Sequence, residues 1–144
     1  MSALPEWFFW ALLSAVFAAM TAIFAKVGLE GVDSDYATLI RTCVILLVLA
    51  AFVFFAGKWS SPFDVSPKTW LFLTLSALAT GASWVCYFRA LKIGEASKVA
   101  PVDKLSLVLV VIFAFIFLHE RPVLREWLGI LMVAAGVVVL GFKR

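Results

Sequence analysis

Five long apolar segments make up most of this chain of 144 residues, and two of them carry charges inside. A helix needs about 20 residues to cross the hydrocarbon core of a bilayer. Segment 36–57 reaches that length only by including Arg41, and segment 99–118 only by including Asp103 and Lys104. An ionisable group at the centre of a span costs about 2.5–3.5 kcal/mol, so it usually faces a cavity, a partner charge or the interface. The sequence therefore predicts a membrane protein with polar groups at depth.

The composition excludes a soluble protein. Hydrophobic residues form 65% of the chain, against about 45–50% in a soluble domain. The net charge is +3, but Lys and Arg lie at segment ends instead of on one basic face, so no nucleic acid is expected as a partner. Pro5 and Glu6 stand where a signal peptide has its basic region, so none is expected. Cys43 and Cys86 lie inside apolar segments and are expected to be small buried hydrophobic residues, with no disulfide or metal site.

Prolines and capping residues predict where the helices begin. Three prolines stand where a first helical turn tolerates them: Pro5, Pro67 and Pro122. Asp33 or Ser34 can cap a second helix, and Pro101 predicts a kink near the start of the fourth. We expect a single all-α integral membrane domain over residues 1–144. Its five transmembrane helices are predicted at about 5–28, 34–57, 67–91, 97–118 and 122–142.

The distribution of Lys and Arg predicts the orientation in a plasma (cell inner) membrane. Five crossings place the N-terminus, loop 58–69 and turn 119–126 on one side, here side A, and the C-terminus on side B. Side A has 4 basic residues and side B has 8, which favours N-out and C-in. Without Lys26, Arg41 and Lys104, which are predicted at membrane depth, side B keeps 5. Insertion in both orientations therefore remains open.

Five ionisable residues fall in the side-B half of the predicted bilayer: Lys26, Arg41, Arg89, Asp103 and Lys104. Such a group indicates a pocket with more cations than anions, which suits an anionic or zwitterionic solute. Asp103 is then a counter-ion or a protonatable coupling site. Alternatively, the long side chains reach the headgroups and only anchor the helices. An ion pair between Arg41 and Asp103 would be a third, purely structural outcome.

A polar stripe lies on the predicted 67–91 helix. Ser76, Thr80, Ser83 and Tyr87 share one face, with Trp84 beside them. This pattern indicates either a hydroxyl-lined track with an aromatic platform or close helix packing with interhelical hydrogen bonds. The complete set of candidate substrate-binding residues is Arg41, Lys104, Asp103, Trp84, Tyr87, Ser83, Lys26 and Arg89.

The remaining polar features do not indicate chemistry. His119, Glu120 and Arg121 precede a proline, which is typical of a solvated turn, although a proton relay is an alternative. Gly129 and Gly136 allow a close helix contact or a dimer interface. No nucleophile, metal-ligand or phosphate-loop spacing occurs in the sequence, so we expect no enzyme, no cofactor and no metal site.

From Tyr87 onward, YFRALKIGEASKVAPVDKLSLVLVVIFAFIFLHERPVLREWLGILMVAAGVVVL resembles the last three helices of an EamA-type domain of the drug/metabolite transporter superfamily. The marks are RALKIGEAS, HERP, WLG and AAGVVVL, and AVFAAMTAIFAKVGL resembles the first helix of that domain. The resemblance implies half of a ten-helix inverted-repeat transporter, with the first four helices around a cavity and the fifth at the periphery. Because typical members carry two such domains and this chain carries one, it implies a homodimer, and we expect an antiparallel one.

The leading hypothesis is a secondary transporter, in the family typically an exporter, that moves a small metabolite by alternating access. Arg41 and Lys104 would bind the anionic group, Asp103 would balance charge or carry a proton, and Trp84 with Tyr87 would shape the apolar side. A flippase for a lipid-linked anion is an alternative that a lateral opening to lipid would favour. A non-transporting membrane subunit or assembly factor is another, in which every charge only anchors a helix. The expected partners are a small solute, the lipid bilayer and a second copy.

Overall fold

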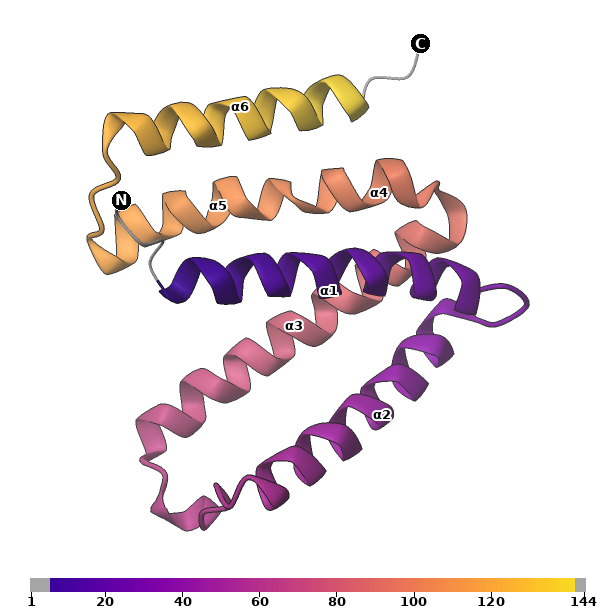
Figure 1. Ribbon diagram of the computed structural model, residues 1–144, viewed down its shortest axis with the longest axis vertical. Helices are drawn as coiled ribbons and strands as arrows, with labels where there is room; N and C mark the ends of the chain where they lie inside the picture. Colours follow the sequence, from indigo (N-terminus) through magenta and orange to yellow (C-terminus); the bar gives the residue numbers. More distant parts are fainter. Residues whose placement is uncertain (1–5, 142–144) are drawn as a thin grey trace. The chain divides into compact units, whose positions relative to one another are not determined.

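The computed structural model describes residues 6–141, and every regular element in that range is a helix (Figure 1). The α-helices are α1 (Glu6–Gly28), α2 (Ser34–Phe55), α3 (Pro67–Ile93), α4 (Ala96–Asp103), α5 (Leu105–Phe113) and α6 (Leu124–Gly141). Two short ones are the 3₁₀ turn η1 (Pro62–Asp64) and the π-helical turn η2 (Ala114–Leu118). The predicted all-α membrane fold is confirmed. The predicted helix ends at Pro5 and 142, and the basic residues Lys143 and Arg144, lie outside the described residues.

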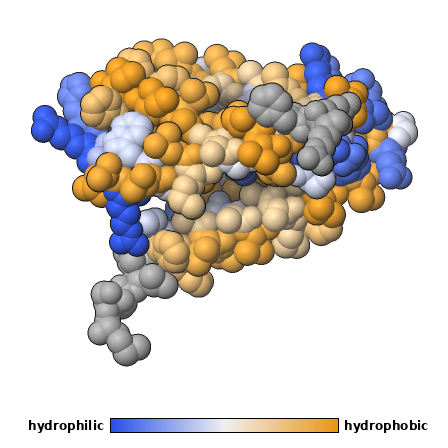
Figure 2. All heavy atoms as spheres, turned by 90° about the horizontal axis from the view of Figure 1, so that it is seen from above, coloured by the Kyte–Doolittle hydropathy of each residue, from blue (hydrophilic) through white to orange (hydrophobic). Residues whose placement is uncertain are grey.

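Four segments of the described chain are long and apolar enough to cross a membrane: Glu6–Gly28, Ser34–Phe55, Pro67–Ile93 and Ala96–Leu118. The last of these joins α4, α5 and η2, and α6 corresponds to the fifth predicted helix. Inside a bilayer every backbone N–H must find its acceptor within the protein, and a helix meets this need within one segment. Figure 2 shows apolar residues over most of the surface in view, with hydrophilic residues gathered toward its edges.

The chain divides into two compact units, each described here by itself. The terminal unit contains α1 up to Ile23 together with α4, α5, η2 and α6. The central unit runs from Phe24 to Ile93 and contains the last turns of α1 with α2 and α3. Within the central unit, α2 and α3 lie side by side (Figure 1).

The buried side chains of the central unit gather where α1 ends, α2 begins and α3 ends. We call this group the junction, and it consists of Leu29, Ser34, Thr38, Phe88 and Leu91. Leu91 is completely buried, with 0% of its surface exposed. Thr38 satisfies its hydroxyl by donating to the Ser34 carbonyl oxygen at 2.8 Å. The junction is therefore the packed part of the unit.

Both ends of α2 have capping motifs. Asp33, one of the two predicted caps, accepts through Oδ1 from the N–H groups of Asp35 at 2.9 Å and Tyr36 at 3.1 Å. Such a cap is worth about 1 kcal/mol. At the other end, α2 stops at Phe55, two residues before the predicted end, because Gly57 adopts φ +64. The Lys58 N–H then bonds to the Val53 carbonyl at 3.1 Å, which completes a Schellman motif.

Two lysines cap each other's helices at the junction. Lys26, near the end of α1, donates from Nζ to the Leu91 carbonyl oxygen of α3 at 2.6 Å. Lys92, near the end of α3, donates from Nζ to the carbonyl oxygens of Leu29 and Val32 that follow α1, both at 2.6 Å. The last carbonyls of a helix have no partner inside it, and the helix dipole favours a cation there. We call these bonds the reciprocal lysine contacts.

An arginine joins the same end of α3 to α2. Arg89 Nε donates to Asp35 Oδ1 at 2.9 Å, and Nη2 donates to Oδ2 at 2.6 Å. The two parallel bonds fix the relative orientation of the groups, since guanidinium and carboxylate are both planar. The side chains are 63% and 47% exposed, so the pair orients the helices more than it stabilises them.

The terminal unit contains the predicted break in the fourth helix. Pro101 has no N–H to donate, and the helix is interrupted at Lys104, whose N–H bonds to the Pro101 carbonyl at 3.0 Å. The interruption lies three residues beyond Pro101, and the kink predicted from Pro101 stays a prediction. Both α4 and α5 pack on α6 (Figure 1).

The expectation that the cysteines are buried was wrong for this chain. Cys43 and Cys86 are free thiols and both side chains are exposed. They lie on outward faces of α2 and α3, because lipid solvates a small apolar side chain as well as a protein interior does. Periodicity within a uniformly apolar helix does not distinguish these two environments.

The reciprocal lysine contacts generate a stability prediction. Replacing Lys92 with Ala removes two short hydrogen bonds to the Leu29 and Val32 carbonyls that follow α1. We expect the free energy of unfolding to fall by about 1–2 kcal/mol, and Tm by a few degrees. Thermal unfolding of the purified protein in detergent measures this change.

The matched control is Lys68→Ala at the start of α3. Within residues 6–141, the Lys68 side chain takes part in none of the hydrogen bonds or ion pairs. An equal Tm for the Lys92→Ala and Lys68→Ala variants would contradict the structural role of the reciprocal lysine contacts.

Candidate functional site

Arg41 is held against two aromatic rings in the central unit. It lies seven residues after Ser34, the first residue of α2, or about 10 Å along the helix. Its Cζ is 4.3 Å from the ring centroid of Trp84 and 5.3 Å from that of Phe88, both on α3. The negative face of an aromatic ring attracts a cation, most strongly for Trp. The half-buried guanidinium is therefore stabilised through its face.

The edge of the Arg41 guanidinium remains available. No carboxylate within residues 24–93 forms an ion pair with Arg41. Asp35 lies on the same helix, but it is paired with Arg89. Stacking on a ring uses the face of the group, whereas its N–H donors point outward in its plane. Those donors match the geometry of a carboxylate or phosphate. The arrangement can therefore bind a planar oxyanion while the rings hold the arginine in place.

Tyr87 and Ser83 are the chain neighbours on α3 of the two rings that hold Arg41, Phe88 and Trp84. The Tyr87 ring is half-buried and meets the Phe88 ring edge to face, with centroids 6.4 Å apart. Ser83 is exposed, one residue before Trp84. Thr80, lower on the predicted stripe, donates to the Ser76 carbonyl of its own helix at 2.9 Å. The Thr80 hydroxyl thus bonds within α3 and not to another helix, as the packing interpretation of the stripe had predicted.

The candidates Lys26 and Arg89 both contact protein groups at the junction. Lys26 donates to the Leu91 carbonyl oxygen, and Arg89 is paired with Asp35. The Arg89 side chain remains 63% exposed, and a solute-binding role for the two residues stays a prediction. In the central unit they hold the helices that carry Arg41 and Trp84.

Asp103 and Lys104 pair with each other in the terminal unit. Lys104 Nζ lies 3.2 Å from Asp103 Oδ2, with side chains 50% and 35% exposed respectively. The pair sits where the backbone ladder between α4 and α5 is interrupted. Arg41 and Asp103 belong to different units, so an ion pair between them stays a prediction.

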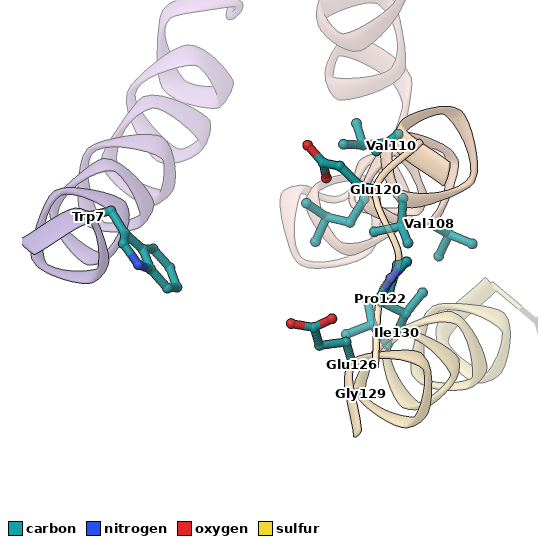
Figure 3. A pocket seen from close by; sticks show the side chains of 12 residues that line it. Trp7, Val108, Val110, Glu120, Pro122, Glu126, Gly129 and Ile130 are labelled. Atoms are coloured by element: carbon teal, nitrogen blue, oxygen red, sulfur yellow. The ribbon is translucent and has the colours of Figure 1, made fainter. Parts of the chain in front are cut away.

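A partly open cavity of about 700 Å³ lies within the terminal unit (Figure 3). Trp7 of α1 stands on one side of it, and residues of α5, α6 and the turn between them form the other. Its walls are apolar except for Glu120 and Glu126. Sequence reasoning missed this cavity because it treated Glu120 as part of a solvated turn. The available signal was the two glutamates on either side of Pro122, next to the apolar stripe of α6.

Comparison with known proteins identifies the family. The model of the EamA-like transporter family matches residues 5–142. An "Uncharacterized transporter in cobO 3'region" of a Sinorhizobium species is 60% identical over 135 residues, which cover 94% of this chain and 96% of that protein. No solved structure matches the chain.

More distant relatives differ in length. The "Uncharacterized transporter YvbV" of Bacillus subtilis is 30% identical over 92% of this chain, but the match covers only 44% of YvbV. The "Probable 4-amino-4-deoxy-L-arabinose-phosphoundecaprenol flippase subunit ArnE" of Salmonella paratyphi A is 28% identical over 67% of this chain and 95% of its own length. The chain is thus similar to a complete short relative and to less than half of a long one. With four candidate spans and a family model over nearly its whole length, this multi-pass membrane protein belongs to the EamA-like transporter family.

Proposed function

We propose that this protein is a secondary transporter that moves a small anionic or zwitterionic metabolite across the plasma (cell inner) membrane by alternating access, as an exporter. The family and the relatives named as transporters support transport without an enzymatic step. One observation carries the choice of solute. The Arg41 guanidinium is held by its face on Trp84, and no carboxylate of the central unit occupies its edge.

In this proposal, Arg41 binds the carboxylate or phosphate of the solute through two parallel N–H donors. Trp84 and Tyr87 provide the apolar side of the site, and the exposed Ser83 hydroxyl serves as a hydrogen-bonding group. Lys26 and Arg89 act as positioning residues, because their contacts fix the helix ends on either side of Arg41. The site therefore needs no cofactor and no metal.

Asp103 and Lys104 have a separate role. Lys104 supplies a second cation for the solute, and Asp103 balances that charge or carries a coupling proton. Their position at the interrupted ladder of α4 and α5 supports this assignment. A helix that lacks a regular hydrogen bond near a proline bends more easily than an intact one. Movement there would change the surroundings of the pair during transport.

A second copy of the chain is part of the proposed transporter. The match covers less than half of YvbV, so one chain supplies about one of the two halves of such a relative. A Cβ atom added at Gly136 would meet no heavy atom within 4 Å, which leaves room for a partner helix against α6. We infer a homodimer, and the nearly balanced Lys and Arg counts favour an antiparallel one.

A flippase for a lipid-linked anion is the second candidate. It is supported by the relative named as a flippase subunit, nearly all of which is matched by this chain. It is also supported by the partly open apolar cavity of the terminal unit, since a cargo with a lipid tail needs an apolar opening. A non-transporting subunit or assembly factor remains the alternative in which no solute binds.

The anion site predicts the phenotype of two variants. Carboxylate- and phosphate-bearing metabolites are first screened for binding by thermal shift, and uptake of the best one is then measured in proteoliposomes. Arg41→Ala and Lys104→Ala should each reduce uptake about 10- to 100-fold, the effect of removing a charged hydrogen bond to the solute. Arg41→Lys should recover only part of the loss, since an ammonium cannot form the two parallel bonds.

The matched control for these variants is Lys68→Ala, which removes an exposed cation at the start of α3. All variants should keep the Tm of the wild type within a few degrees, so that a loss of uptake reports the site. Uptake equal to the wild type in both Arg41→Ala and Lys104→Ala would remove the proposed anion site. Failure of every solute to bind would favour the non-transporting alternative.

The antiparallel dimer predicts the labelling of single cysteines. With Cys43 and Cys86 replaced by Ser, a cysteine is introduced at Ser60, between α2 and α3, or at Glu30, between α1 and α2. These loops lie on opposite predicted sides of the membrane. A membrane-impermeant maleimide added to intact cells should label about half of the molecules at each position. Labelling of one position only would establish a single orientation and contradict the antiparallel dimer.

A further inference from the structure

The cavity of the terminal unit is charged at one end and apolar elsewhere. Glu120 and Glu126 contribute its carboxylates, whereas Val108, Val111 and Ile130 are among its apolar walls. In Figure 3 the two carboxylates project from their backbones toward the space that faces Trp7. The lining residues of α5 and η2 run from Leu107 to Ala114, which is about two turns or about 10 Å. This shape suits a ligand with a small cationic head and an apolar tail.

The backbone turn before α6 places Glu120 at the cavity. His119 ends η2 in the left-handed conformation, with φ 56, which reverses the direction of the chain. The Glu120 N–H then donates to the carbonyl of Ala114, itself a lining residue, at 3.2 Å. The π-helical turn is thus the local cause of the position of Glu120, and such turns frequently occur at functional sites.

Glu126 is held by its role as a helix cap. Its Oε2 accepts from the Val123 N–H at 2.8 Å, which fixes the carboxylate at the start of α6 and leaves Oε1 for a ligand. Within the described part of the terminal unit, neither Glu126 nor Glu120 forms an ion pair. Arg121 and Arg125 follow nearby in the chain but do not line the cavity. Two exposed carboxylates thus border the apolar walls without a cationic partner among the described residues of this unit.

The side chains that line the cavity favour an organic cation over a metal ion. Among residues 6–141 no cluster of three metal-ligating side chains occurs, and a hydrated ion gains nothing from apolar walls. An organic ammonium can donate hydrogen bonds to both carboxylates, and the Trp7 ring can attract its charge. A tail on that ammonium would cover the valines of α5 and Ile130 of α6. The volume of about 700 Å³ lies within the usual range of small-molecule sites.

We propose that this cavity binds an aminophospholipid, with the ammonium of phosphatidylethanolamine on Glu120 and Glu126 and an acyl chain along α5 and α6. A bilayer component is favoured over a dissolved amine because the cavity is partly open and lies among exposed apolar side chains such as Leu128 and Leu131. A Trp at the first turn of a membrane helix, as Trp7 is in α1, is typical of headgroup depth. The proposal does not rest on the anion site at Arg41, which lies in the other unit.

Lipid retention in native mass spectrometry tests the proposal. The purified protein is reconstituted with palmitoyl-oleoyl phosphatidylethanolamine, phosphatidylcholine or phosphatidylglycerol, and bound lipid is counted after delipidation. We expect phosphatidylethanolamine to be retained about tenfold more than phosphatidylglycerol, which has no cation, with phosphatidylcholine between them because it cannot donate N–H bonds. The double variant Glu120→Gln/Glu126→Gln should lose this preference. Glutamine at position 126 keeps an oxygen to accept from the Val123 N–H.

The matched control is Glu30→Gln, which removes an exposed carboxylate between α1 and α2 in the central unit. It should retain phosphatidylethanolamine as the wild type does. If the double variant does not fold, lipid retention by the single variant Glu120→Gln tests the proposal instead, because the Glu120 side chain caps no helix. Equal retention of phosphatidylethanolamine and phosphatidylglycerol, or an unchanged preference in the variants, would overturn the proposal.

A spectroscopic measurement locates the lipid. Phosphatidylethanolamine with brominated acyl chains should quench Trp7 fluorescence, measured as the difference between the wild type and Trp7→Phe. Quenching should disappear in the double glutamine variant. Dodecylamine, a free cationic amphiphile, should compete with the lipid. If dodecylamine binds while phosphatidylethanolamine does not quench Trp7, the site takes soluble amines and the assignment to a lipid is wrong.

Discussion

The arrangement of the central unit depends on the reciprocal lysine contacts. Lipid tails are as apolar as leucine, so the hydrophobic effect does not drive helices together within a bilayer. Polar groups at helix ends must then specify which ends meet. Lys26 does this by donating to the Leu91 carbonyl in the last turn of α3, and Lys92 by donating to the Leu29 carbonyl just after α1, both at 2.6 Å. Because these bonds tie the ends of α1 and α3 to the start of α2, they set the register in which Arg41 meets Trp84.

The two arginines of the central unit show how a structural cation differs from a binding cation. Arg89 uses its Nε and Nη2 edge on Asp35, with bonds of 2.9 and 2.6 Å, so its charge already has a carboxylate partner. Arg41 uses its face on Trp84 and Phe88, and its edge has no carboxylate partner in the central unit. A charge held at depth by rings alone is incompletely satisfied. That deficit is the physical reason to assign Arg41, and not Arg89, to the anion.

Much of the fold could be predicted from the sequence because its signals are local. Proline, Asp33 and Gly57 act on their own turns, and apolar length alone decides what can cross a membrane. The partners of Lys26 and Arg89 could not be predicted in this way. A backbone carbonyl such as that of Leu91 carries no sequence signal as an acceptor, since every residue has one. The cavity was missed for a related reason: a π-helical turn and a left-handed His119, not a periodic pattern, bring Glu120 to Glu126.

The same constraint separates the charges of this chain into two groups. A charged side chain in or near the membrane has one of two roles. It either joins helices of the chain or binds a group that belongs to another molecule. Lys26, Lys92 and Arg89 belong to the first group, since each contacts a carbonyl or a carboxylate of the central unit. Arg41 and the glutamates of the cavity belong to the second, each within its own unit. They have opposite signs, so a single ligand class does not explain both. In our two proposals, a solute anion at Arg41 and a lipid ammonium at the glutamates would satisfy each charge separately.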